Sequence, residues 1–120
     1  MREKTMITAV VGSRGLSVED MGKYIPRDTT EIVSGGAAGI DRCAEKYAAV
    51  HGIPLKVFLP RYDLYGRAAP VRRNEQIVMY ADRVVAIWDG SSRGTGWVIA
   101  MCIKHSVPVY IYIIEENRDL

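Results

Sequence analysis

The sequence predicts a three-layer α/β sandwich, in which one mostly parallel five-stranded sheet lies between layers of helices. Short segments rich in β-branched and aromatic residues alternate along the chain with segments of helical spacing. The short segments are apolar on both faces, as strands are when a parallel sheet is covered on both sides. Each step from one strand to the next is short enough for a single right-handed crossover.

Five segments are predicted to be strands: Thr5–Val11, Glu31–Ser34, Leu55–Leu59, Arg83–Trp88 and Val109–Ile114. The strongest helix signal follows the second strand, where apolar residues recur at i, i+3, i+4, i+7 and i+8 from Ile40 to Ala48. Helices are also predicted over Val71–Tyr80 and Trp97–His105, with a weaker one over Val18–Tyr24. The resulting β-α-β-α-β-α-β-α-β order is that of a single doubly wound, Rossmann-like domain over residues 1–120. One long irregular stretch is predicted, from Pro60 to Ala69, and a loop of that length is more often functional than idle.

Composition excludes several classes of protein. The chain has 120 residues, of which 48% are hydrophobic and 25% charged, and these values are ordinary for a folded globular protein. Its net charge of +2 comes from 16 basic and 14 acidic residues without a basic cluster, which argues against sequence-blind binding of duplex DNA. Cys43 and Cys102 are far apart and lack metal-ligand spacing, and the first apolar run is too short to span a membrane. We therefore expect a cytoplasmic protein without a metal or a cofactor.

Three glycine-rich segments follow predicted strands: Gly12–Gly15 after the first, Ser34–Asp41 after the second and Asp89–Gly96 after the fourth. In open α/β sheets, ligands bind beyond the carboxyl ends of the strands, so these segments are expected to meet at one edge. Glycine lets backbone amides approach an anion, and the N-terminus of a following helix adds positive potential. The pattern favours a ligand that carries phosphate, although it matches neither the dinucleotide fingerprint nor a Walker A loop.

Hydroxyl, guanidinium and amide groups at the same edge complete the predicted site. Arg73 follows a predicted helix start, where a cation needs an anionic partner, and Asn74 can donate and accept at a base or ribose edge. Asp41 either caps its turn or binds a ribose hydroxyl, and Tyr62 or Tyr65 is expected to stack on a base. The candidate ligand-binding residues are Gly12, Ser13, Arg14, Ser34, Gly35, Gly36, Ala37, Asp41, Arg73, Asn74, Asp89, Gly90, Ser91, Gly94 and Thr95.

The segment Ser34-Gly35-Gly36-Ala37-Ala38-Gly39-Ile40-Asp41 resembles the signature of the DNA-processing protein A (Smf) family. Gly12-Ser13-Arg14, Arg73-Asn74 and Asp89-Gly90-Ser91-x-x-Gly94-Thr95 extend the similarity to the SLOG superfamily, most closely to its small stand-alone YspA-like members. The resemblance implies a Rossmann-like domain that binds a nucleotide or a nucleotide-derived ligand, such as a signalling nucleotide. It also implies self-association into a homo-oligomer, since relatives pair through helices beside the cleft, and some relatives bind single-stranded DNA.

A second branch that the sequence is similar to is the lonely-guy phosphoribohydrolases, which cleave the N-glycosidic bond of nucleoside monophosphates. Their motif carries a glutamate in the active site, and the corresponding position here is Val98. An apolar side chain can neither activate water nor stabilise an oxocarbenium-like centre. We therefore expect nucleotide binding rather than catalysis, and the spacing assigns no catalytic residue. Phosphoribohydrolase activity and single-stranded DNA binding stay as alternatives, and the near-neutral charge disfavours the second.

Overall fold

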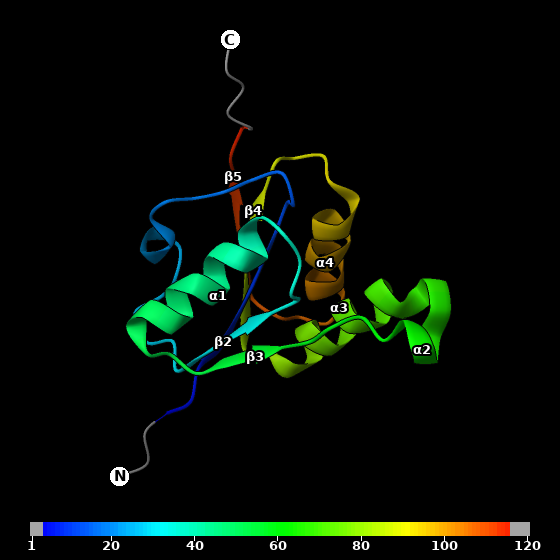
Figure 1. The fold of residues 1–120 in the computed structure, drawn as a ribbon, viewed down its shortest axis with the longest axis horizontal. Helices are drawn as coiled ribbons and strands as arrows, with labels where there is room; N and C mark the ends of the chain where they lie inside the picture. The colour runs from blue at the N-terminus through cyan, green and yellow to red at the C-terminus, as the bar shows by residue number, and fades with distance from the viewer. Residues whose placement is uncertain (1–3, 116–120) are drawn as a thin grey trace.

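The computed structural model describes residues 4–115 and contains one all-parallel five-stranded sheet, as the fold prediction required (Figure 1). Its strands are β1 (Ile7–Gly12), β2 (Glu31–Ser34), β3 (Leu55–Val57), β4 (Arg83–Trp88) and β5 (Val109–Ile113). They lie in the order β3-β2-β1-β4-β5, so the chain winds outward to one edge and then returns to the other side of β1. The switch in winding direction falls between β1 and β4, where ligands of such sheets usually bind.

Helices cover both faces of the sheet. α1 (Ile40–His51) packs on one face, and α3 (Ala69–Tyr80) and α4 (Arg93–Lys104) pack on the other. Side chains alternate along β1 between the two apolar clusters, with Val10 on the α1 face and Val11 on the face of α3 and α4. Because β1, β2 and β4 are buried from both sides, most of their inner residues are apolar, which is why their positions can be predicted from the sequence.

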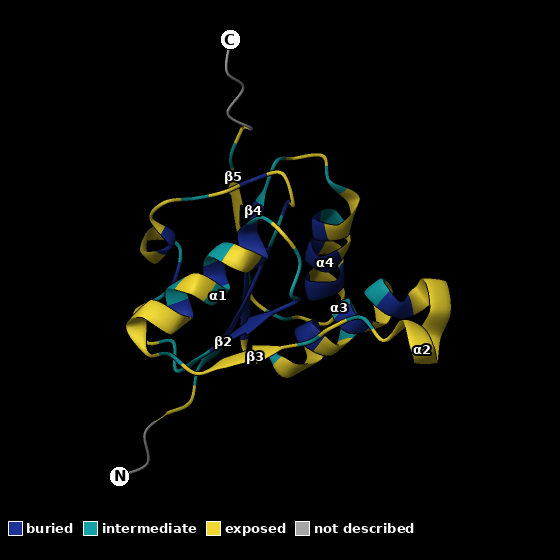
Figure 2. Cartoon of the chain, in the orientation of Figure 1, coloured by how far each residue is buried: buried dark blue, intermediate teal, exposed yellow. Residues whose placement is uncertain are grey.

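Two predicted connections differ from the structure. The predicted helix over Val18–Tyr24 is only a 3-10 turn, η1 (Met21–Lys23). Gly22 disfavours a longer helix, and Met21 is the one buried residue of the segment, so little packing would stabilise it. The stretch from Pro60 to Ala69 is not irregular, since it forms α2 (Tyr62–Tyr65) and a second 3-10 turn, η2 (Gly66–Ala68). These two short helices form an exposed arm beside the start of α3 (Figure 2).

The helices that border the predicted site begin earlier than the apolar periodicity indicates. α4 begins at Arg93 rather than Trp97, so Gly94 and Thr95 lie in its first helical turn instead of in a loop. α3 begins at Ala69 and has Pro70 in its first turn. Proline fits there because the backbone N–H groups of the first turn have no acceptor within the helix. No helix in residues 4–115 is long and apolar enough to cross a membrane.

Candidate functional site

A cleft of about 430 Å³ opens at the carboxyl ends of β1, β2 and β4. Small-molecule sites typically measure about 300–1,000 Å³, so this cleft has room for a ligand the size of a mononucleotide. It is lined by Val11, Gly12, Ser13, Arg14, Gly15, Gly35, Ala37, Asp41, Pro70, Arg73, Asn74, Ile77, Asp89, Ser92, Gly94, Thr95 and Val98. The three glycine-rich segments of the sequence therefore do converge on one space.

Most of the candidate ligand-binding residues line this cleft, namely Gly12, Ser13, Arg14, Gly35, Ala37, Asp41, Arg73, Asn74, Asp89, Gly94 and Thr95. Ser34, Gly36, Gly90 and Ser91 lie outside it. The Ser34 hydroxyl is buried and donates to Glu45 Oε2 at 2.7 Å, while it accepts from the Gly36 amide at 3.1 Å. Ser34 therefore holds its own turn in shape.

The apolar lining of the cleft is the part that the sequence did not reveal. Val11, Ile77 and Val98 contribute to it and also belong to the core cluster between the sheet and α3 and α4. A residue that serves both the core and a cleft looks like any other core residue in a sequence. The cleft thus combines an apolar surface with polar groups, an arrangement typical of ligand sites.

Ser13 joins two of the loops. Its side chain is almost fully buried, and its hydroxyl lies 2.7 Å from the Ser92 hydroxyl and accepts from the Asp89 amide at 3.0 Å. Its own amide donates to the Ile87 carbonyl at 3.1 Å. The end of β1 is thereby fixed to the β4–α4 connection, so Ser13 shapes the cleft chiefly by positioning its walls.

Two of the glycine-rich loops already hold carboxylates of their own. Asp89 Oδ1 accepts from the amides of Ser91 and Ser92 at 2.8 and 2.7 Å. Asp41 Oδ2 accepts from the Ala37 amide at 3.2 Å, which is the turn-capping role considered for it in the sequence. These amides were expected to be free for a ligand anion, and for them that expectation is wrong. The first-turn amides of α4, at Gly94 and Thr95, lack an acceptor within the helix and line the cleft.

The two aspartates experience different environments. The backbone hydrogen bonds from Ser91 and Ser92 lower the pKa of Asp89 below its ordinary value of 3.8, so it is ionised at neutral pH. Burial raises the pKa of Asp41 above 3.8, and the nearby Glu45 carboxylate adds to this, whereas the Ala37 amide and the Arg73 guanidinium oppose it. In the cleft, hydrogen bonds therefore stabilise the ionised form of Asp89, whereas burial disfavours the ionised form of Asp41.

Replacing Asp41 with asparagine should leave the protein at least as stable as the wild type at pH 7. Asparagine keeps an oxygen that can accept from the Ala37 amide but carries no buried charge. Because the pKa of Asp41 is raised on folding, the folded state holds its proton more tightly than the unfolded chain does. Wild-type stability should therefore fall relative to the variant as the pH rises from about 4 toward neutrality. Thermal unfolding of both proteins across this range measures the difference, and a variant less stable than wild type at pH 7 would contradict it.

Arg73 is the buried cation of the cleft. Its side chain projects from α3 and is buried. Nη1 donates to the Gly35 carbonyl in the loop after β2, and Nε donates to Asn74 Oδ1 at 2.8 Å. Burial lowers the pKa of Arg73, yet a guanidinium stays charged at neutral pH. Within the described residues, these two bonds use two of the five guanidinium N–H groups, so three are left for a ligand. A Cβ on Gly35 would lie 2.7 Å from Arg73 Nη1, so glycine makes room for the guanidinium.

Glycines at the other loops have two different roles. Gly39 has a φ of +75°, and a Cβ there would lie 2.5 Å from the Arg14 carbonyl oxygen, so glycine lets the two loops touch. At Gly94 the situation is reversed, because no atom lies within 4 Å of the position a Cβ would take. Gly94 is exposed and lines the cleft, so its missing side chain leaves open space at this wall.

The aromatic residues near the site lie in four different places. Tyr62 is 60% exposed and lines a shallow hollow that shares Arg14 and Arg73 with the cleft, whereas Tyr65 lies under the Arg72 guanidinium on the arm. Trp88 packs against the core, and its ring N–H donates to the Ser92 carbonyl at 2.9 Å. Trp97 lies in a separate groove of α3 and α4. Of these aromatic residues, Tyr62 is the one that lines a space sharing residues with the cleft.

Comparison with protein-family models, with curated proteins and with solved structures finds no match to this chain. The similarity to the SLOG superfamily therefore stays a prediction based on short motifs. What the cleft binds has to be inferred from its own chemistry.

Proposed function

We propose that this protein binds a nucleotide or a nucleotide-derived ligand in the cleft at the carboxyl ends of β1, β2 and β4. The observation that carries the proposal is the buried Arg73, which keeps free N–H donors beside an apolar wall in a space of about 430 Å³. A phosphate group would accept from the guanidinium and from the first-turn amides of α4. The apolar surface of Val11, Ile77 and Val98 suits the faces of a base.

The charge balance of the cleft favours a ligand with few negative charges. Two cations, Arg14 and Arg73, share the lining with two carboxylates, Asp41 and Asp89. A triphosphate would place several charges near both aspartates, whereas a single phosphate can contact the arginines alone. A carboxylate can also accept from ribose hydroxyls, so a mononucleotide with a free ribose fits this set of groups best.

Thermal unfolding with a panel of ligands tests the proposal. Nucleoside monophosphates, cyclic nucleotides, triphosphates and adenosine diphosphate ribose are each added at millimolar concentration. A ligand that binds only the native state at about 100 times its dissociation constant stabilises it by about 2.7 kcal/mol, which raises the melting temperature by several degrees. We expect monophosphates to give the largest shift, and the proposal is wrong if no compound in the panel shifts the transition.

Hydrolysis of the N-glycosidic bond of nucleoside monophosphates is the second candidate function. One observation favours it: Asp41 is a buried carboxyl at the cleft, and its pKa is raised. General acids and bases of enzymes often have shifted pKa values of this kind. Val98 argues against it, because the position of the hydrolase glutamate contributes only apolar surface. Chromatography of the same incubations for free base separates the two functions, and base release that disappears in Asp41→Asn would establish the hydrolase. For single-stranded DNA binding, the described cleft lacks the excess of basic groups that such binding requires.

A further inference from the structure

The two edges of the sheet are protected to different degrees. β3 has three residues, and its central residue is Lys56, a charge of the kind that blocks pairing with other chains. β5 has five residues, Val-Tyr-Ile-Tyr-Ile, with neither a charge nor a proline. By the usual rules for edge strands, β3 is protected and β5 is open to a partner.

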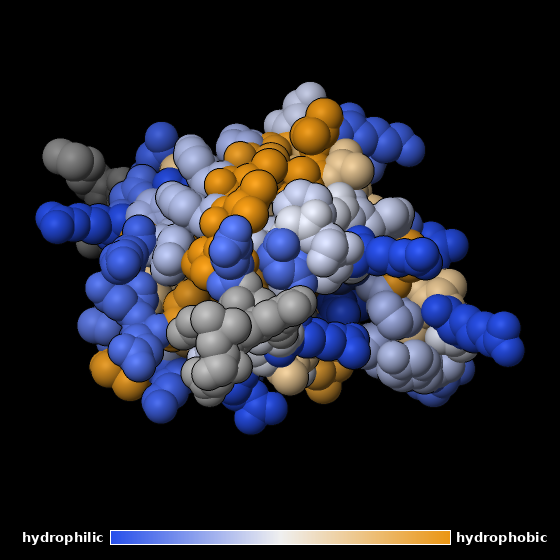
Figure 3. Space-filling model, turned by 90° about the horizontal axis from the view of Figure 1, so that it is seen from above, coloured by the Kyte–Doolittle hydropathy of each residue, from blue (hydrophilic) through white to orange (hydrophobic). Residues whose placement is uncertain are grey.

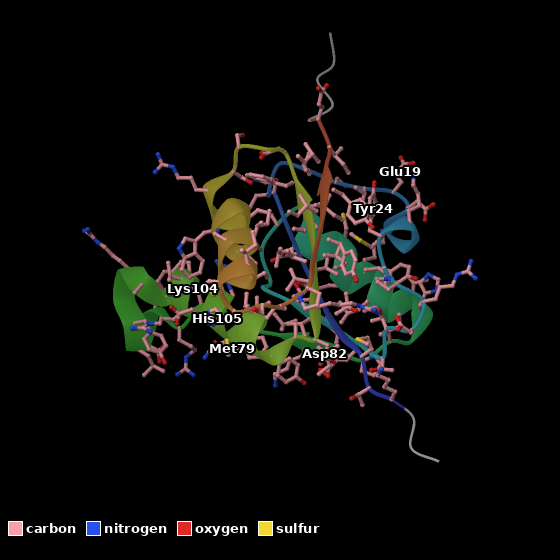
Figure 4. The ribbon with its side chains drawn as sticks, turned by 180° about the vertical axis from the view of Figure 1, so that it is seen from behind. Glu19, Tyr24, Met79, Asp82, Lys104 and His105 are labelled. Carbon is pink, nitrogen blue, oxygen red and sulfur yellow. The ribbon has the colours of Figure 1, made fainter. Side chains whose placement is uncertain are left out.

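The side chains of β5 are largely exposed as well. Tyr110, Ile111, Tyr112 and Ile113 are 48%, 44%, 38% and 65% exposed, although all are apolar or aromatic. Seen from behind, β5 is the strand nearest the reader, and the helices lie to either side of it (Figure 4). Seen from above, apolar atoms gather in a band on the visible face of the molecule (Figure 3). A row of this kind is unusual for a surface that stays in water.

The hydrogen bonds between β5 and β4 show which backbone N–H and C=O groups of β5 face its open side. At its two ends, the Pro108 carbonyl accepts from the Val84 amide at 2.9 Å, and the Ile114 amide donates to the Trp88 carbonyl at 2.8 Å. Alternate residues of a strand direct their N–H and C=O groups to the same neighbour. The even-numbered residues from 108 to 114 therefore bond with β4, and Val109, Ile111 and Ile113 direct theirs outward.

We propose that β5 pairs in antiparallel fashion with β5 of a second copy of this chain, about a two-fold axis beside Ile111. In this register Ile111 faces Ile111 of the other copy, and Val109 faces Ile113. The residues with outward groups then meet only each other, so each of these pairs exchanges two hydrogen bonds. Tyr110 faces Tyr112 on one side of the joined sheet, and aromatic cross-strand pairs of this kind are stabilising.

A second copy satisfies this edge better than an unrelated strand because the sequence is complementary to itself. The next charged residue after β5 is Glu115, which falls opposite Val107 in this register. Within residues 107–115, the register therefore brings no like charges together. The two-fold pairing uses both open edges, and Lys56 protects the edges that remain, so assembly stops at a dimer. Two five-residue strands bury less than the roughly 800 Å² per partner of a standard interface, so we expect dissociation in the micromolar range.

Sedimentation velocity of the full chain from about 1 to about 300 µM tests the pairing. The wild type should pass from a mass of 13.4 kDa toward twice that value. Ile111→Lys should stay monomeric, because two like charges would meet at the axis. Ile111→Pro should also stay monomeric, yet it should fold, because the amide it removes points away from β4. The matched control is Leu55→Lys on the opposite edge strand, which should dimerise like the wild type.

Three outcomes would overturn the proposal. They are a wild type that stays monomeric throughout the range, a mass that rises beyond a dimer, and an Ile111→Lys variant that dimerises like the wild type. Circular dichroism of each variant shows whether it is folded, so that a loss of dimer is not confused with a loss of structure. No residue of β5 lines the cleft, so the result does not depend on whether a nucleotide binds.

Discussion

Replacing Gly94 with leucine should abolish binding of the nucleotide that most raises the melting temperature, while the protein stays folded. Gly94 lies in the first turn of α4 and lines the cleft, with no atom within 4 Å of an ideal Cβ. Because Gly94 lines the cleft and has open space around it, we expect a leucine side chain there to occupy part of the space that we assign to the ligand. Leucine and alanine are also better helix formers than glycine, so the free energy of unfolding should stay level or rise by up to about 1 kcal/mol.

Calorimetric titration of the nucleotide into Gly94→Leu measures the loss, which we expect to exceed about 100-fold in affinity. Gly94→Ala, which adds a single methyl group, should bind with intermediate affinity and unfold at a higher temperature. The matched control is Ala100→Leu, an exposed position of the same helix that lines the separate groove of α3 and α4 instead of the cleft. Unchanged affinity in a folded Gly94→Leu protein would mean that the nucleotide binds somewhere else.

The fold could be predicted because its main determinant is visible in the sequence. Strands buried on both faces, such as Arg83–Trp88, are apolar at every central position, and the helix from Ile40 to His51 keeps one apolar stripe. Connections were less predictable, because their conformation depends on contacts rather than on periodicity. α4 begins before its apolar stripe does, and the arm of α2 and η2 has no buried residue from which a period could be read.

The location of the cleft could be predicted for a topological reason, since loops after parallel strands share one edge of the sheet. The roles of individual residues could not. Gly12 was expected to admit an anion, but a Cβ there would lie 2.5 Å from Ile40 Cβ, so its glycine serves the packing of α1 against β1. Whether a loop amide is free depends on the rotamer of an aspartate such as Asp89, and a sequence does not show that.

Replacing Arg73 with methionine should weaken both nucleotide binding and the fold. The guanidinium donates to the Gly35 carbonyl and to Asn74, and hydrogen bonds from charged groups contribute about 1.5–3 kcal/mol each. We expect a loss of about 2–4 kcal/mol in the free energy of unfolding, and a further rise in the pKa of Asp41, whose carboxylate loses the opposing charge of Arg73. Loss of a charge-assisted contact to phosphate should lower affinity by about 50-fold.

The adjacent Arg72 provides the matched control for this experiment. Arg72 lies on the exposed side of α3, where it pairs with Glu75 at 3.3 Å, and such surface ion pairs contribute about 0–1 kcal/mol. Arg72→Met should therefore bind nucleotide and unfold like the wild type. Arg73→Lys separates charge from geometry, because an ammonium keeps the charge but cannot reach Gly35, Asn74 and a ligand in the fork arrangement. If Arg73→Met lost stability but bound the nucleotide with wild-type affinity, its guanidinium would serve only to fasten α3 to the loop after β2.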